Sequence, residues 1–227
     1  MVKQAWAKLP TAWLNVNGPQ PCPLAALQWQ GYRSTGQAAL LLLMGLTIRR
    51  NQSLRGQELD APCHQVAVTY DDLQDLAGVA RGTVAKAIAH LEAWGAIKVQ
   101  AQGRRSVYEL CGLERAGGWC QLPQARLLNS SGTGLAPFRG NRANRNSLNA
   151  MKLYVLLMAK RYQRLNTAAV SYMTMTQQAG VRREDIPNAL QQLIALGLVS
   201  LAPEKGDGRE DVDGRTQRYV IEGLKRV

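Results

Sequence analysis

The sequence predicts a mainly α-helical α+β fold with small β-hairpins, built from two tandem copies of one unit. Two observations lead to this prediction. The segment AVTYDDLQDLAGVARGTVAKAIAHLEAWGAIKV at residues 67–99 matches, without a gap, the segment AVSYMTMTQQAGVRREDIPNALQQLIALGLVSL at residues 169–201. The chain of 227 residues is also long enough for two domains of about 100 residues, each with its own core.

The similarity between the halves continues outside the matched segments. WAKLPTAWL at residues 6–14 matches CQLPQARLL at 120–128, and the apolar stretch at 34–50 matches 148–164. The order of the matched segments is the same in both halves, so we predict an internal duplication. The predicted division is a first domain at residues 1–113, a basic linker leading into the second unit at 114–147, and a second domain at 148–227.

The first domain is expected to begin with an apolar-periodic helix at about 35–50. A helix–turn–helix is predicted over about 69–94, with Thr69 as the N-cap and Gly78 at the end of its first helix. Two short strands follow and form a hairpin, the first wing, over about 97–110.

The second domain repeats this order. Its opening helix is expected at 148–164, and a helix–turn–helix over about 171–196 has Ser171 as N-cap and Gly180 in the turn. A second wing is predicted over about 198–221. A helix, a helix–turn–helix and a β-hairpin in this order form a winged helix, so two tandem winged helix–turn–helix domains are predicted.

The two faces of each second helix have different compositions. Val84, Ile88 and Leu91 form an apolar stripe that is expected to pack into the core. The opposite face carries Arg, Asn and Gln, the side chains that can make bidentate hydrogen bonds to base edges in the major groove of DNA. A solvated helix face would also be polar, and that reading stays open. The candidate base-reading residues are Arg81, Thr83, Lys86, Arg182, Arg183, Asn188 and Gln191.

Positive charge is the second indication of a nucleic-acid partner. The formal net charge is +12 and the sequence pI is about 10.0, which favours a polyanionic partner. Residues 126–164 contain no Asp or Glu, and the spacing of Arg139, Arg142 and Arg145 suits a sugar–phosphate backbone; the alternative is a solvated linker. The candidate backbone contacts are Arg104, Arg105, Arg139, Arg142, Arg145, Lys152, Arg215 and Arg218.

The tips of the two wings differ in charge. The first tip, Gln-Gly-Arg-Arg at 102–105, is suited to contact phosphates or a minor groove. The second tip, at 204–218, is long and carries five acidic residues, which would repel phosphate. We therefore expect the two domains to dock differently.

Several function classes find no support in the sequence. There are two histidines, no Gly-rich nucleotide-binding loop and no acidic cluster, so we expect no enzyme activity, no metal and no cofactor. The four cysteines lack a CxxC pair. The longest apolar stretch, at 38–46, is about half the length that a transmembrane helix needs, so we expect a cytoplasmic protein without a membrane partner. His90 is expected on the solvent or phosphate side of its helix, and the N-terminal tryptophans as core or interface anchors.

The segments LPTAWL and LAGVARGTVAKAIAHLEAWGAI, each with a counterpart in the second half, give the chain a resemblance to tandem winged-helix replication initiator proteins of plasmids and phages. The resemblance implies sequence-specific binding of double-stranded DNA at adjacent half-sites. It also implies partners among replication or transcription proteins, or a second copy of the chain in a homodimer. The alternatives are a transcriptional repressor or regulator, and an adaptor subunit of a larger nucleoprotein complex.

Overall fold

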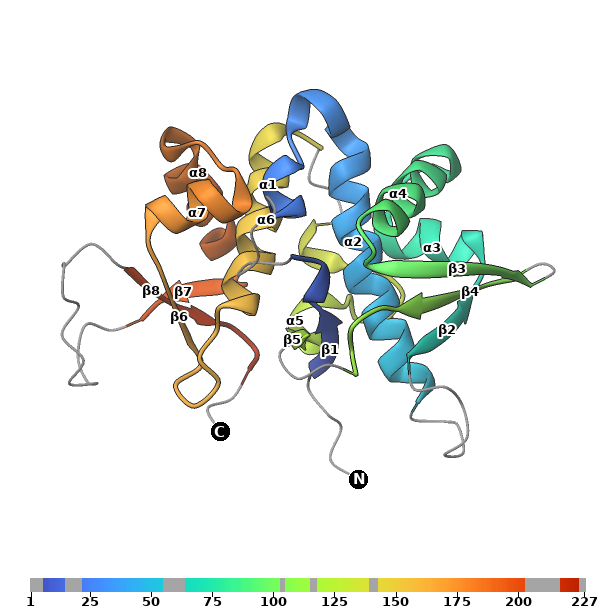
Figure 1. The fold of residues 1–227 in the computed structure, drawn as a ribbon. Helices are drawn as coiled ribbons and strands as arrows, with labels where there is room; N and C mark the ends of the chain where they lie inside the picture. The colour runs from blue at the N-terminus through green and yellow to red at the C-terminus, as the bar shows by residue number, and fades with distance from the viewer. Residues whose placement is uncertain are drawn as a thin grey trace.

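The structure is a computed structural model. It describes residues 6–14, 22–54, 64–102, 105–114, 118–138, 143–202 and 217–224. Helices and small antiparallel sheets alternate along the chain, which confirms the predicted α+β class (Figure 1). Two long helices, α2 and α6, run through the middle of the molecule, with a helix pair and a three-stranded sheet on each side.

The described residues of the first half form four strands and several helices. Its elements are β1 (Trp6–Pro10), η1 (Ala12–Leu14), α1 (Pro23–Ala26), α2 (Trp29–Ser53), β2 (Gln65–Val68), α3 (Tyr70–Ala77), α4 (Arg81–Ala93), β3 (Ile97–Gln102) and β4 (Arg105–Leu110). The sheet has the order β2-β4-β3, with all pairs antiparallel.

The second half follows the same plan. Its elements are β5 (Trp119–Pro123), α5 (Gln124–Leu127), η2 (Ala136–Phe138), α6 (Arg145–Ala159), β6 (Thr167–Val170), α7 (Tyr172–Ala179), η3 (Arg183–Asp185), α8 (Ile186–Ala195), β7 (Val199–Leu201) and β8 (Gln217–Ile221). The sheet has the order β6-β8-β7, which is the order of the first sheet with each strand replaced by its counterpart.

Local sequence signals set the ends of the short helices. The hydroxyl of Thr69 accepts a hydrogen bond from the Asp72 N–H at 3.1 Å, and the Asp72 carboxylate accepts one from the Thr69 N–H at 3.0 Å. Ser171 caps α7 by accepting from the Thr174 N–H at 3.1 Å. Both helices end in a left-handed glycine, Gly78 or Gly180. These predicted caps are confirmed.

The long helices begin earlier than their predicted bounds. Helix α2 starts at Trp29 and is interrupted at Arg33, whose φ of 46° lies outside the helical region. Helix α6 starts at Arg145 because the Asn144 side chain accepts a hydrogen bond from the Ser147 N–H at 2.8 Å. It ends at Ala159 instead of residue 164, where the chain turns toward β6.

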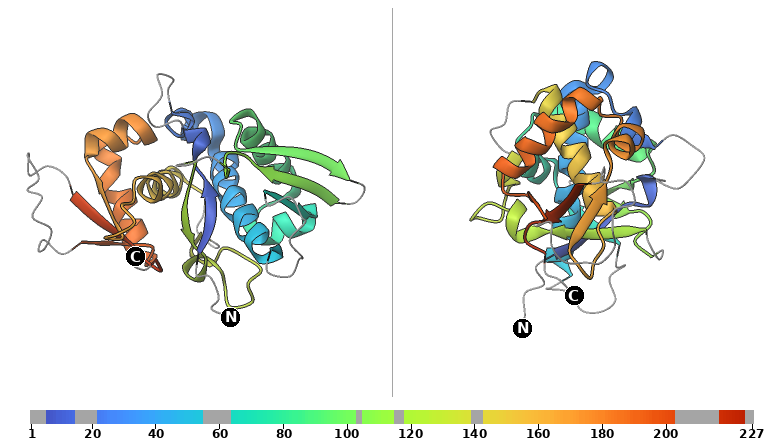
Figure 2. Two further views of the ribbon diagram at one scale, coloured as in Figure 1. Left: turned by 60° about the horizontal axis from the view of Figure 1, so that its bottom comes forward. Right: turned by 90° about the vertical axis from the view of Figure 1, so that its left-hand side faces the viewer.

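A two-stranded sheet joins the two halves. Strand β1 pairs antiparallel with β5, with Trp6 opposite Pro123 and Pro10 opposite Trp119. The rings of Trp6 and Trp119 stack with centroids 5.9 Å apart, as expected for an interface anchor. Figure 1 and the left-hand view of Figure 2 show this sheet between the two sides of the molecule.

Part of the predicted linker, residues 114–147, therefore belongs to the core. Leu122 of β5, Leu127 of α5 and Phe138 of η2 are all buried. The bounds of the two domains stay a prediction, but the stretch predicted as linker and entry segment contains a strand whose pairing with β1 could not be recognised from its own sequence.

Each half also contacts the helix pair of the other. Helix α1 of the first half packs on α7, where a Cβ on Gly180 would lie 2.4 Å from the Ala25 carbonyl oxygen. Gln28 donates a hydrogen bond to the Gly180 carbonyl at 3.0 Å. In the opposite direction, the Leu135 N–H donates to the Leu76 carbonyl of α3 at 3.2 Å. These reciprocal contacts fix the two helix pairs relative to each other.

Candidate nucleic-acid interface

Helix α4 presents the candidates of the first half. Arg81 and Lys86 are exposed, and Thr83 is half-buried. Arg81 Nη1 lies 3.3 Å from an Asp71 carboxylate oxygen, and the guanidinium lies 4.9 Å from the Tyr70 ring centroid. Because both charged side chains are largely exposed, this pair contributes little to stability, and Arg81 can exchange Asp71 for another anion.

His90 does not take the outward position that the sequence suggested. Its ring packs edge-on against Tyr32 at 4.7 Å and parallel to Trp94 at 6.1 Å. Desolvation by these neighbours lowers the pKa of His90 below its usual value. His90 therefore holds α4 against the start of α2, and we assign it no contact with phosphate.

Helix α8, with the turn before it, presents the candidates of the second half. Arg182, Arg183, Asn188 and Gln191 are all exposed. Arg182 lies 3.8 Å from the carboxylate of Glu184, an exposed and weak pair. The structure thus leaves these four side chains available to a ligand, as their candidate role requires.

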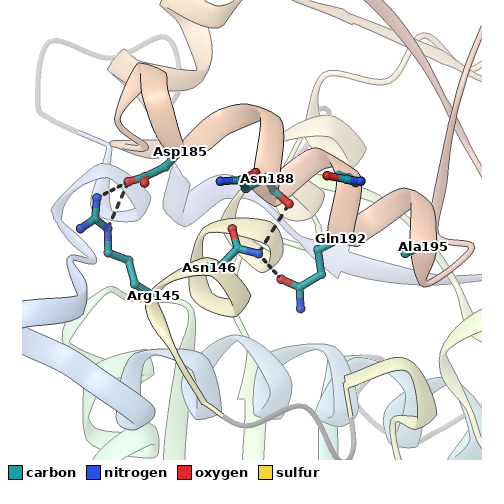
Figure 3. A pocket seen from close by; sticks show the side chains of 7 residues that line it. Arg145, Asn146, Asp185, Asn188, Gln192 and Ala195 are labelled. Atoms are coloured by element: carbon teal, nitrogen blue, oxygen red, sulfur yellow. Dashed lines mark hydrogen bonds and ion pairs between the residues drawn. The ribbon is translucent and has the colours of Figure 1, made fainter.

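An open polar groove of about 650 Å³ lies between α8 and the start of α6 (Figure 3). Asn146 donates to the Gln192 side-chain oxygen at 2.7 Å, and Gln192 donates to the Ser147 hydroxyl at 3.2 Å. At one end, Arg145 Nε donates to Asp185 Oδ2 at 3.1 Å. The lining residues are Arg145, Asn146, Asp185, Asn188, Gln191, Gln192 and Ala195.

The groove is lined by some residues that the sequence suggested as candidates and by others that it did not suggest. Asn188, Gln191 and Arg145 were candidates for DNA contact. Asn146 and Asp185 were missed, because the predicted opening helix began at residue 148 and Asp185 was assigned no role. The Asn144-Arg145-Asn146-Ser147 run, with a capping residue first, was the signal for an earlier helix start.

The predicted backbone contacts have different outcomes. Arg105 is exposed on β4, and Arg218 is half-buried on β8. Arg145 is exposed enough to contact a ligand but is paired with Asp185. The remaining four arginines, Arg104, Arg139, Arg142 and Arg215, lie outside the described residues.

Lys152 was predicted to contact phosphate, and the structure corrects this. Its relative exposure is 0%, and its ammonium donates to the Leu27 carbonyl of the other half at 2.7 Å. Desolvation lowers the pKa of Lys152 to about 8. Arg161, from the same basic stretch, is also buried and donates to Gln121 and Asn166. Two of the basic residues between 126 and 164 therefore hold the core together.

No protein-family model matches the chain, and no curated protein sequence is significantly similar to it. Within the described ranges, no three His, Cys, Asp or Glu side chains gather as a metal site would require. No helix in the described part of the chain is long and apolar enough to cross a membrane.

Proposed function

We propose that the protein binds double-stranded DNA sequence-specifically through two tandem winged helix–turn–helix domains, and that it acts as a replication initiator of a plasmid or phage. The observation that carries the proposal is the recurrence of one arrangement in both halves. A long helix, a strand, a helix pair and a hairpin follow in the same order, with the same strand order in the sheet. The outer face of each second helix carries exposed polar side chains.

Equivalent positions make the corresponding contact in each half, which supports a duplication. The gap-free alignment places Gln192 of α8 at the position of His90 of α4. His90 packs on Tyr32, at the start of α2, and Gln192 bonds Asn146, at the start of α6. Tyr32 and Asn146 are themselves equivalent in the alignment of the long helices. Each second helix thus rests on the same point of its long helix.

The chemistry of α8 suits recognition of bases. An α-helix fits the major groove, where Asn and Gln can bond adenine bidentately and Arg can bond guanine. Asn188 and Gln191 are three residues apart, so they lie on the same face of α8. Each bidentate pair would contribute about 1–3 kcal/mol of discrimination against a wrong base.

The connection between the halves supports binding at two adjacent half-sites. The β1–β5 sheet and the contacts of α1 with α7 hold α4 and α8 in one rigid arrangement. Binding of the first helix therefore brings the second to its half-site at a high effective concentration. A single chain gains affinity in this way without forming a dimer.

The experiment is selection of bound duplexes from a random pool, followed by fluorescence anisotropy titration of the best sequence. Replacing Arg182 and Arg183 by alanine should relax sequence preference by about tenfold or more. The control Gln163→Ala changes an exposed residue in the turn after α6, at the far end of that helix from the groove, and should leave binding unchanged. Failure of the wild-type protein to enrich any sequence would contradict the proposal.

The arrangement of the selected sites separates initiator from regulator. Repeated copies beside a replication origin favour an initiator, and one site overlapping a promoter favours a transcriptional regulator that uses the same surface. A protein-binding adaptor is the second candidate. It is favoured by Met173, Ile194 and Leu201, which are 64%, 42% and 52% exposed in the second half. This candidate predicts weak, sequence-tolerant binding to nucleic acid.

A further inference from the structure

The ion pair between Arg145 and Asp185 connects the starts of two helices. Arg145 is the first residue of α6, and Asp185 is the last residue before α8. Both Nε and Nη2 of the guanidinium donate to the same oxygen, Oδ2 of Asp185. Asp185 occupies the N-cap position of α8, yet its side chain makes no capping hydrogen bond. The Asp185 carboxylate therefore accepts hydrogen bonds from Arg145 and does not cap α8.

This ion pair is specific to the second half. The equivalent positions in the first half are Gly31 and Thr83, which cannot form an ion pair. The start of α2 contacts α4 through the rings of Tyr32 and His90 instead. The pair is thus not a general requirement for joining a long helix to the helix pair.

We propose that Asp185 takes the place of a DNA phosphate in the free protein and that Arg145 transfers from Asp185 to a phosphate when α8 binds a duplex. This proposal rests on the DNA-binding function proposed above. A guanidinium bonds carboxylate and phosphate oxygens with the same fork of N–H donors, so the exchange requires no new donor geometry. Arg145 lies at the end of the groove that also holds Asn188 and Gln191, so both kinds of contact can form together (Figure 3).

The exchange makes DNA binding by the second half depend on base contacts. Arg145 must leave a partner whose side chain is only 23% exposed. This cost lowers the affinity for every duplex by the same factor. Base contacts by Asn188 and Gln191 offset this cost on the right sequence, so Asp185 limits non-specific binding.

A double-mutant cycle on the full chain tests this inference. The variants are Asp185→Asn, Arg145→Gln and the combination, titrated by fluorescence anisotropy against a random-sequence duplex over a range of salt. Asp185→Asn should tighten binding about fivefold, because it removes the ion pair that must break before Arg145 can bind a phosphate. This factor corresponds to the free energy of an ion pair of moderate exposure. Arg145→Gln should weaken binding and reduce the salt slope by about 0.9, which corresponds to one lost phosphate contact. In the double variant, the fivefold gain should disappear.

The control Asp75→Asn removes the same charge from an exposed position on α3 and should change affinity less than about twofold. Asp185→Ser, which places a side chain able to cap α8 at this position, should reproduce the gain if the asparagine variant folds poorly by circular dichroism. A gain that persists in the Arg145→Gln background would overturn the exchange and leave DNA binding intact. Absence of any duplex binding by the wild-type protein would overturn both proposals.

Discussion

Replacing Lys152 by methionine should stabilise the protein at neutral pH and destabilise it at alkaline pH. The ammonium is fully buried, and its pKa of about 8 lies below the ordinary lysine value of 10.5. This difference corresponds to about 3 kcal/mol of lost stability at neutral pH, where the buried group is charged. Methionine has a similar length and removes this cost, but it leaves the Leu27 carbonyl without its donor, which costs about 1–2 kcal/mol.

The variant should therefore be about 1–2 kcal/mol more stable than wild type at pH 7. Between pH 8 and 10.5 the unfolded state binds the proton that the folded state has lost, so the wild-type free energy of unfolding rises with pH relative to the variant. Above this window the charge cost is gone, and the variant should be less stable by about 1–2 kcal/mol because of the lost hydrogen bond.

Urea unfolding of both proteins at several pH values from 7 to 10.5 measures this difference directly. Lys86→Met, on the exposed face of α4, controls for the loss of one positive charge. A difference between wild type and Lys152→Met that does not change with pH would refute the reasoning. DNA affinity provides a second readout. If Lys152 contacted a phosphate, Lys152→Met would lower the affinity for DNA. Because Lys152 is buried, we expect no direct loss of affinity.

Three further substitutions test the contacts that define the fold, each by urea unfolding. Gly180→Ala should destabilise by more than 2 kcal/mol, since its Cβ would collide with Ala25, whereas Gly197→Ala has a similar φ with open space around it and should cost only about 1 kcal/mol. Equal losses would contradict the close approach of α1 and α7. Asn166→Ala should cost about 2–4 kcal/mol because Asn166 makes three buried hydrogen bonds, and a loss below 1 kcal/mol would argue against that network. Thr69→Ala should cost about 1 kcal/mol through the lost cap of α3.

The features that the sequence predicted well are local. The caps at Thr69 and Ser171 and the hairpin at 97–110 agree with the structure, because each depends on a few neighbouring residues. The exposed faces of α4 and α8 also agree, since helical periodicity alone separates Val84 from Lys86.

The features that the sequence missed depend on contacts between distant residues. Lys152 looked like one more basic residue of a charged stretch, and only the fold brings it under the Leu27 carbonyl. The sequence predicted His90 on the solvent side of its helix, whereas Tyr32 and Trp94 pack against its ring in the structure. The partner of Arg145 is forty positions away at Asp185, in the turn between α7 and α8, and no sequence pattern connects the two.

Footprinting on the selected duplex tests the central claim most directly, namely that α4 and α8 read one DNA molecule at two neighbouring places. The wild-type protein should protect two major-groove segments about one helical turn apart, or a multiple of it. Combined alanine substitution of Arg81 and Lys86 should erase one segment, and that of Asn188 and Gln191 the other. A single protected segment that is unaffected by either pair of substitutions would contradict the account.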